Sequence, residues 1–287
     1  MGNFSGRPRS GTDPARFPPI RSVIRRYWDA DGPSHSRALA YYSIVALHSG
    51  LIGFIGLASL LDVAAVRGTV QEWLVQLSPG PSGRILGTAV GQTTAGGAAA
   101  VLGLGAALFV GTRAMAQFQR ASDRLWGIAE DPPAVRRYLV GFALAVSAGL
   151  LLALGAVVLA GGETIATGAG WGDDLRALWR VVRWPFGVLL AVAAVTVLYR
   201  MAPRARPSAR ALLMGAAVAI VLWIGFTALL SLYFSVSDRL MQSFGPLAGI
   251  VALALWAAFT AVALHLGVAV TAEASTTRPP SVGTASA

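Results

Sequence analysis

Long apolar stretches, interrupted by short charged segments, set the pattern of this 287-residue chain. Six stretches lack Asp, Glu and Arg, and each can hold one helix. A helix needs about 20 residues to cross the hydrocarbon core of a bilayer, and an isolated sheet would leave backbone polar groups unpaired in lipid. The pattern therefore predicts transmembrane helices at about residues 38–61, 94–112, 138–161, 180–199, 211–235 and 247–271.

The two ends of the chain differ in composition from these spans. Residues 1–20 and 275–287 are rich in Ser, Pro and Gly and lack apolar periodicity, so we expect disordered tails around a membrane domain at 21–274. The first apolar run is 24 residues long and follows a 37-residue tail, whereas a signal peptide has a short apolar region near its start. We therefore interpret this run as a retained span.

Two segments between the spans have amphipathic helical patterns. The first, "VRGTVQEWLVQL" (66–77), suits either the outer membrane interface or a short helix packed on protein. The second, at 113–131, contains "QFQRASDRLWGIAED" and extends the second span. Its apolar face consists of Met115, Phe118, Ala121, Leu125 and Ile128. Its other faces carry Arg113, Arg120, Asp123 and Arg124. The predicted fold is an all-α polytopic membrane protein with six transmembrane helices plus interfacial amphipathic helices.

Composition and charge narrow the function classes. The chain is 55% hydrophobic and only 13% charged, which is too apolar for an ordinary water-soluble domain. Its net charge of +10 comes from 23 Arg and no Lys, but apolar runs separate these side chains, so they predict no nucleic-acid surface. The absence of Cys excludes disulfides, thiol catalysis and Cys-bound metals.

Arg is distributed unevenly between the two sides of the predicted membrane domain. Seventeen Arg fall on the side that holds both chain ends, and six fall on the other. Cytoplasmic loops carry an excess of positive charge, so both termini are predicted to be cytoplasmic. The preference for Arg, Ala and Gly is typical of a GC-rich bacterial genome, and we expect the protein in the bacterial cytoplasmic (inner) membrane with membrane lipids as its partners.

Four segments carry a resemblance to a known family. "QRASDRLWGI" (119–128) resembles the segment that identifies the BrkB/YihY family of multi-pass membrane proteins, once labelled ribonuclease BN. Three further segments resemble this family in the same order: "SRALAYYSIVAL" (36–47), "LYRMAPRARPSARALLMGAAVAIVLW" (198–223) and "FGPLAGIVALALWAAFTAVAL" (244–264). The chain departs from the family pattern at His48–Ser49, where a Pro is usual, and at 267–269, where Gly-Ala-Glu is usual.

The resemblance implies an integral inner-membrane protein with six helices and no generally accepted activity. Family members have been proposed to help move lipids or other amphipathic molecules, and the ribonuclease label is generally considered a misassignment. The two departures remove a Pro kink and an intramembrane carboxylate, so the resemblance implies nothing about chemistry that depended on them. The fold is expected to survive both changes.

Polar residues inside the expected spans are candidates for a substrate path. His48 lies near the middle of the first span and His265 late in the sixth, where an imidazole must either line a path or make a structural hydrogen bond. Ser231 and Ser235 lie one turn apart in the fifth span, in line with Thr227. These hydroxyls line a polar path or bond to their own backbone carbonyls.

Basic residues at the expected cytoplasmic side are candidates for contact with lipid headgroups. Arg200, Arg204 and Arg206 lie in a short loop stiffened by Pro, which suits an anionic headgroup. Arg120, Arg124 and Trp126 lie in the segment with the strongest family resemblance. The alternative for both sets is that they only fix orientation and anchor the protein at the interface.

Other polar residues have plainer interpretations. Tyr41 and Tyr42 suit the aromatic belt at the membrane interface. Glu163, Asp173 and Asp174 lie in an outer loop that either gates an opening or is solvated.

The sequence favours two function classes and disfavours a third. A lipid-translocating protein accounts for the basic rim and intramembrane His, and a noncatalytic scaffold or envelope-integrity protein accounts for them as helix-packing groups. A ribonuclease needs clustered carboxylates or His in an aqueous cleft, and no zinc spacing, phosphate loop or paired carboxylates in one segment support that function. We therefore expect no enzyme activity, no metal and no cofactor.

Overall fold

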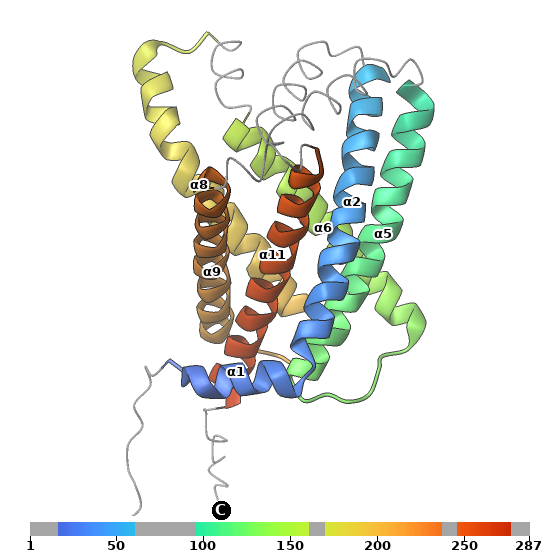
Figure 1. Cartoon of the computed structure of the whole chain (residues 1–287), viewed down its shortest axis with the longest axis vertical. Coiled ribbons are helices and arrows are strands. Elements are labelled where there is room, and N and C mark those ends of the chain that lie inside the picture. The colour runs from blue at the N-terminus through green and yellow to red at the C-terminus, as the bar shows by residue number, and fades with distance from the viewer. Residues whose placement is uncertain (1–16, 61–95, 161–169, 237–245, 277–287) are drawn as a thin grey trace, which may run out of the picture.

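The fold consists of long helices with one short helix across their end (Figure 1). The computed structural model describes residues 17–60, 96–160, 170–236 and 246–276. Its helices are α1 (Ile20–Asp29), α2 (Gly32–Leu60), α5 (Gly96–Leu125), α6 (Ala134–Ala160), α8 (Asp173–Met201), α9 (Ala209–Val236) and α11 (Pro246–Thr276). No strand occurs in these ranges, which confirms the all-α prediction.

The six long helices alternate in direction along the bundle (Figure 1). The connections at 126–133 and 202–208 lie at the same end of the bundle as α1 and the end of α11. Most described Arg residues belong to this end, which we call the basic end. The opposite end, near the start of α5 and α11, is called the outer end.

The number of membrane-spanning helices differs from the sequence prediction. Five described helices are long and apolar enough to cross a membrane: α5, α6, α8, α9 and α11. The sequence predicted six, and the remaining long helix is α2. α2 is 29 residues long and carries Arg37, Tyr41, Tyr42 and His48 along its described part.

Glycine permits the closest helix crossings in the bundle. A Cβ on Gly53 of α2 or on Gly103 of α5 would collide with the backbone of the other helix. Gly215 of α9 and Gly267 of α11 form a second close crossing of this kind. Small residues drive helix association in membranes because they let backbones approach closely.

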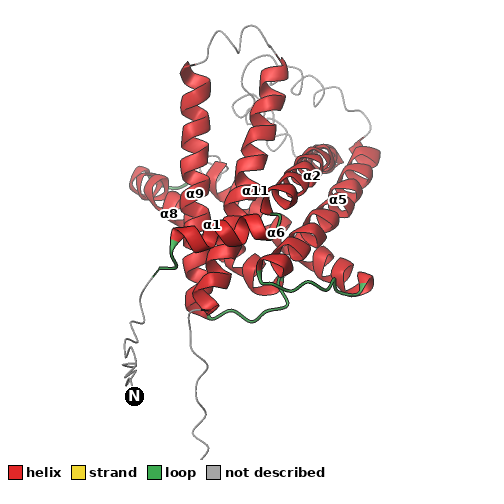
Figure 2. Ribbon diagram, turned by 60° about the horizontal axis from the view of Figure 1, so that its bottom comes forward, coloured by secondary structure: helices red, strands yellow, loops and turns green. Residues whose placement is uncertain are grey.

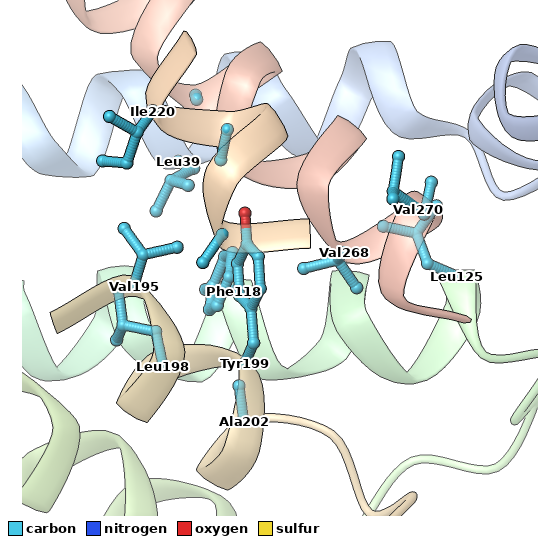
Figure 3. Packing of buried hydrophobic residues seen from close by; sticks show 14 of the residues in the cluster. Leu39, Phe118, Leu125, Val195, Leu198, Tyr199, Ala202, Ile220, Val268 and Val270 are labelled. Carbon is cyan, nitrogen blue, oxygen red and sulfur yellow. The ribbon is translucent and has the colours of Figure 1, made fainter. Parts of the chain in front are cut away.

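The core lies near the basic end and surrounds α11. Ala261, Ala263, His265 and residues 268–272 of α11 are buried, and α1, α2, α5, α8 and α9 all contact this helix. Figure 3 shows Phe118 and Tyr199 in the middle of the cluster. Towards the outer end α11 is less enclosed, since Ile250 and Val251 at its start are 62% and 52% exposed.

The segment at 113–131 packs inside the protein instead of lying along a membrane interface. α5 runs without interruption to Leu125, and the chain turns at Gly127, whose φ of +77° suits glycine. Phe118, Ala121 and Leu125 are buried as predicted, but so is Asp123, which the helical pattern placed on a solvated face. Asp123 is buried because Arg204 of the 202–208 connection pairs with it, whereas Arg113 and Arg124 stay exposed. The amphipathic segment at 66–77 lies outside the described residues.

α1 was not anticipated from the sequence. It begins directly after Pro19, whose fixed φ suits the entry to a helix, and Ser22 donates a hydrogen bond to the Pro19 carbonyl at 2.8 Å. Val23 and Tyr27 are buried against the bundle. The helix therefore belongs to the folded domain.

Candidate functional site at the basic end

A buried hydrogen-bonded chain connects α1, α2 and α11. The Tyr27 and Ser36 hydroxyl oxygens are 3.0 Å apart, and Ser36 Oγ lies 3.0 Å from Nδ1 of His265. His265 has no exposed surface, and its Nε2 has no hydrogen-bond partner among the described residues. A buried polar atom without a partner is costly, so this imidazole is only half satisfied at the centre of the bundle.

The ring of Phe118 lies against the imidazole of His265. The Phe118 ring centroid lies 5.4 Å from that of His265, and Tyr199 stacks on Phe118 at 6.4 Å. The Tyr199 hydroxyl donates to the Leu264 carbonyl at 2.7 Å. A Cβ at position 267 would collide with that hydroxyl, so Gly267 leaves room for the Tyr199 contact.

A second histidine, His35, lies nearer the surface of the same region. Nε2 of Gln117 donates to its Nδ1 at 2.9 Å. Burial lowers the pKa of His35 below its ordinary value of 6.5, and the positive charges of Arg120 and Arg124 lower it further against the opposing effects of Asp31 and Asp131. Folding therefore favours the neutral form of the His35 imidazole.

Two ion pairs tie the ends of the helices together. The Arg204 guanidinium and backbone N–H both donate to Asp123, and the guanidinium also donates to the Glu130 carbonyl. Arg26 of α1 donates to Glu273 Oε2 at 2.7 Å and to the Leu125 carbonyl at 3.0 Å. The pairs join α5 to the 202–208 connection and α1 to α5 and α11.

A small polar cavity of about 30 Å³ lies beside the Asp123–Arg204 pair. Its polar lining comes from Gln119, Asp123, Arg136 and Arg204. This volume suits about one water molecule, which is too small for a lipid headgroup.

Asp131 lies among three arginines in the connection after α5. Its carboxylate is 3.4 Å from Arg120, 3.9 Å from Arg124 and 3.7 Å from Arg137. One carboxylate facing three cations leaves this surface with a positive excess. Asp131 is about half exposed, so these pairs add little to stability.

The predicted path residues do not come together. His265 is buried, but His48 is exposed on α2, and its Nδ1 lies 2.9 Å from the Ile44 carbonyl of its own helix. Ser231 is exposed on α9, and Ser235 lies in α9 at a position whose side chain is not described. Thr227 is partly buried, and its Oγ1 finds no hydrogen-bond partner within the described part of the chain.

Some of the arginines predicted to contact headgroups face carboxylates of the protein, and the others are exposed. Arg204 is engaged with Asp123, and Arg120 and Arg124 face Asp131. Arg200 and Arg206 are exposed, and neither pairs with a carboxylate in the described part of the chain. Trp126 is partly buried and its Nε1 has no partner.

The remaining polar residues lie at exposed positions. Tyr41 is exposed and forms an edge contact with Tyr42, while Asp173 and Asp174 are exposed at the start of α8. Glu163 lies outside the described residues.

Similarity to known proteins is consistent with this arrangement. The family model described as Virulence factor BrkB matches residues 23–286. The chain belongs to the BrkB family. It is a multi-pass membrane protein, as this family, a membrane-protein relative and the apolar helices together indicate.

Two relatives align with most of this BrkB-family chain but differ in how much of their own length the alignment covers. YfkH of Bacillus subtilis (strain 168), whose name calls it ribonuclease-like, is 23% identical over 256 residues, covering 86% of this chain and 92% of YfkH. The UPF0761 membrane protein azo3165 of Azoarcus sp. (strain BH72) is 25% identical over 263 residues, covering 88% of this chain and 62% of the relative. No solved structure matches the chain.

Sequence reasoning missed most partners of His265 in this BrkB-family protein. Tyr27, Ser36, Phe118 and Tyr199 are all buried around the α11 core. One signal was available, since Val23 and Tyr27 lie one turn apart directly after Pro19 and so predict a helix with a buried face. No group of three or more His, Cys, Asp or Glu that would hold a metal occurs among the described residues.

Proposed function

We propose that this BrkB-family protein moves a lipid, or another amphipathic anion, across the bacterial cytoplasmic membrane without chemical conversion. Both termini and the basic end then lie in the cytoplasm, in keeping with the Arg asymmetry. The helices provide the lipid contact that such a role requires.

The contrast between the two halves of α11 carries this proposal. Near the basic end this helix is enclosed, and His265 lies buried there with an unpartnered Nε2. Near the outer end, Ile250 and Val251 are exposed. A polar group inside a span is costly and marks a functional site by default, and a bundle closed at one end suits a carrier in one of two states.

Two exposed arginines supply a place for an anionic headgroup in this proposal. Arg200 ends α8 and Arg206 follows it in the short connection to α9. A guanidinium binds phosphate by two parallel hydrogen bonds, and basic residues beside a span attract anionic lipids. Because Arg204 is engaged with Asp123, we assign the headgroup contact to Arg200 and Arg206.

A specific observation favours a second candidate, a noncatalytic scaffold. The Asp123–Arg204 pair joins α5 to the 202–208 connection, and His48 bonds only within its own helix, so these polar groups have structural contacts in place of a polar path. A ribonuclease-like role, which the name of YfkH suggests for that protein, has less support here. The buried polar groups of this chain form hydrogen bonds between segments in its core. Binding of RNA would instead require an open basic surface.

Leaflet exchange in proteoliposomes tests the proposal. The purified full-length protein is reconstituted with fluorescent anionic and zwitterionic phospholipids, and exchange is followed as a reducing agent removes outer-leaflet fluorescence. We expect protein-dependent exchange that is lost in His265→Leu and slowed for the anionic lipid in Arg200→Gln/Arg206→Gln. His48→Ala is the matched control and should retain exchange.

Two outcomes of this experiment would contradict the proposal. Folded wild-type protein that exchanges neither lipid contradicts a lipid translocator and favours the scaffold. Equal loss in His48→Ala and His265→Leu would contradict the assignment of the path to the buried imidazole.

A further inference from the structure

α1 has an apolar surface that the bundle does not cover. Val23 and Tyr27 face the bundle and are buried. A second set of large apolar residues stays exposed along the helix and just before it: Phe17 at 69%, Ile20 at 76%, Ile24 at 46% and Trp28 at 64%. Their spacing of three and four residues places them on one stripe, adjacent to the buried face.

The position of α1 is fixed by buried and charged contacts. Arg26 bonds to Glu273 and to the last carbonyl of α5, and Tyr27 bonds to Ser36 in the chain that ends at His265. α1 therefore lies across the basic end, at a steep angle to the long helices (Figures 1 and 2). If those helices cross a bilayer, α1 runs roughly parallel to its surface.

The charges of α1 complete an interfacial pattern. Arg21 and Arg25 are exposed and border the apolar stripe, and Asp29 lies further round on the polar face. An interfacial helix places its apolar face about 5–10 Å into the headgroup and acyl boundary and keeps basic residues among the headgroups. Trp suits this depth because its indole has an apolar body and a polar edge.

We propose that α1 is docked on the anionic phospholipid leaflet at the basic end. Phe17, Ile20, Ile24 and Trp28 enter the acyl layer, and Arg21 and Arg25 bind headgroup phosphates. The occupant is lipid because the stripe lies beside the membrane-crossing helices and is bordered by cations that complement an anionic surface. The docking is independent of whether the protein moves lipids.

The lack of cysteine in this chain makes the test direct. Single-cysteine variants Ile24→Cys and Asp29→Cys of the full-length protein are labelled with an environment-sensitive fluorophore. They are reconstituted in vesicles of phosphatidylglycerol and phosphatidylcholine, and quenching is measured with a lipid that carries a quencher high on its acyl chain and with aqueous iodide. Both positions lie on α1, so the pair compares two faces of the same helix.

We expect the acyl-chain quencher to act at least about threefold more strongly on the label at position 24 than on the label at position 29, and iodide to act in the reverse order. Replacing phosphatidylglycerol by phosphatidylcholine, or introducing Arg21→Gln/Arg25→Gln, should weaken the acyl-chain quenching at position 24. Arg176→Gln/Arg180→Gln at the outer end is the control for overall charge and should leave it unchanged.

Three results would overturn the proposal. Iodide quenching at position 24 equal to that at position 29 would place the stripe in water. A label at position 24 that is shielded from both quenchers would mean that protein, such as a second copy, covers the stripe. Quenching at position 24 that is insensitive to lipid charge and to Arg21 and Arg25 would exclude selection of an anionic leaflet.

Discussion

Arg204 holds the carboxylate of Asp123 through two groups at once. Its backbone N–H donates to Oδ1 at 2.9 Å and its Nε donates to Oδ2 at 3.0 Å, across 81 positions of sequence. The Asp123 side chain is 4% exposed, so this carboxylate depends on Arg204 for its counter-charge. The end of α5 is thereby fixed to the 202–208 connection.

Removing Arg204 should destabilise the protein strongly. Arg204→Ala leaves a buried carboxylate unpaired, and breaking a buried pair from one side costs about 3 kcal/mol. We expect a lower apparent Tm of the purified protein in detergent, followed by intrinsic fluorescence. Arg206→Ala, two positions away and exposed without a carboxylate partner in the described chain, is the matched control and should leave Tm nearly unchanged.

A double-mutant cycle separates the pair from local effects. Asp123→Asn/Arg204→Ala should lose clearly less stability than the sum of the two single variants, because each single change already removes the interaction. Additive losses would show that the two residues act independently.

The close approach of α2 and α5 gives a second prediction. Gly103→Ala should cost about 1–3 kcal/mol, because the new Cβ collides with the backbone at Gly53 and the helices must separate. Gly105→Ala, on the same helix with open space around it, should be neutral or stabilise by up to about 1 kcal/mol through helix propensity. Unfolding in mixed micelles with increasing dodecyl sulfate measures both; equal effects would contradict the crossing.

The fold class followed from sequence because lipid restricts the backbone choices so severely. Apolar runs between charged segments predict helices whatever their partners are. The pattern predicted six spans; five described helices are long and apolar enough to cross a membrane, and the sixth long helix is α2. α1 was missed because only ten residues carry its pattern, directly behind a polar tail.

The candidate site was only partly predictable, because burial depends on partners that sequence spacing does not reveal. His265 was recognised as an intramembrane imidazole, but its neighbours Tyr27 and Ser36 come from segments 229 or more positions earlier. Asp123 was placed on a wet face because its helix is amphipathic when taken alone. Its burial follows from Arg204, which arrives from another connection.

The stability of the protein should depend on pH through His35. Its pKa in the folded state is lowered, mainly by burial, so the unfolded chain binds a proton at a higher pH than the folded one. The stability that His35 contributes is present above about pH 6.5 and is lost as pH falls through its lowered pKa. We expect Tm of the wild type to fall more steeply between pH 7 and pH 5 than Tm of His35→Gln. Parallel curves for the two proteins would contradict this assignment.

The buried imidazole of His265 should make the folded protein less stable than an apolar side chain at the same position would. Nε2 is buried without a partner, and replacing such a group by an apolar side chain of similar size is neutral or stabilising. We therefore expect His265→Leu to have a Tm equal to or above that of the wild type, while Ser36 keeps its hydrogen bond to Tyr27.

Measuring exchange on the same samples makes this prediction decisive for function. A His265→Leu protein that is as stable as the wild type yet exchanges no lipid would place the imidazole in the working mechanism, because loss of folding could not explain the defect. Ser36→Ala provides the complementary variant, since it removes one partner and leaves both His265 nitrogens buried. It should lower the free energy of unfolding by about 1–2 kcal/mol, and Tm with it. If His265→Leu instead unfolds the protein, the imidazole is a packing group and the scaffold explanation gains.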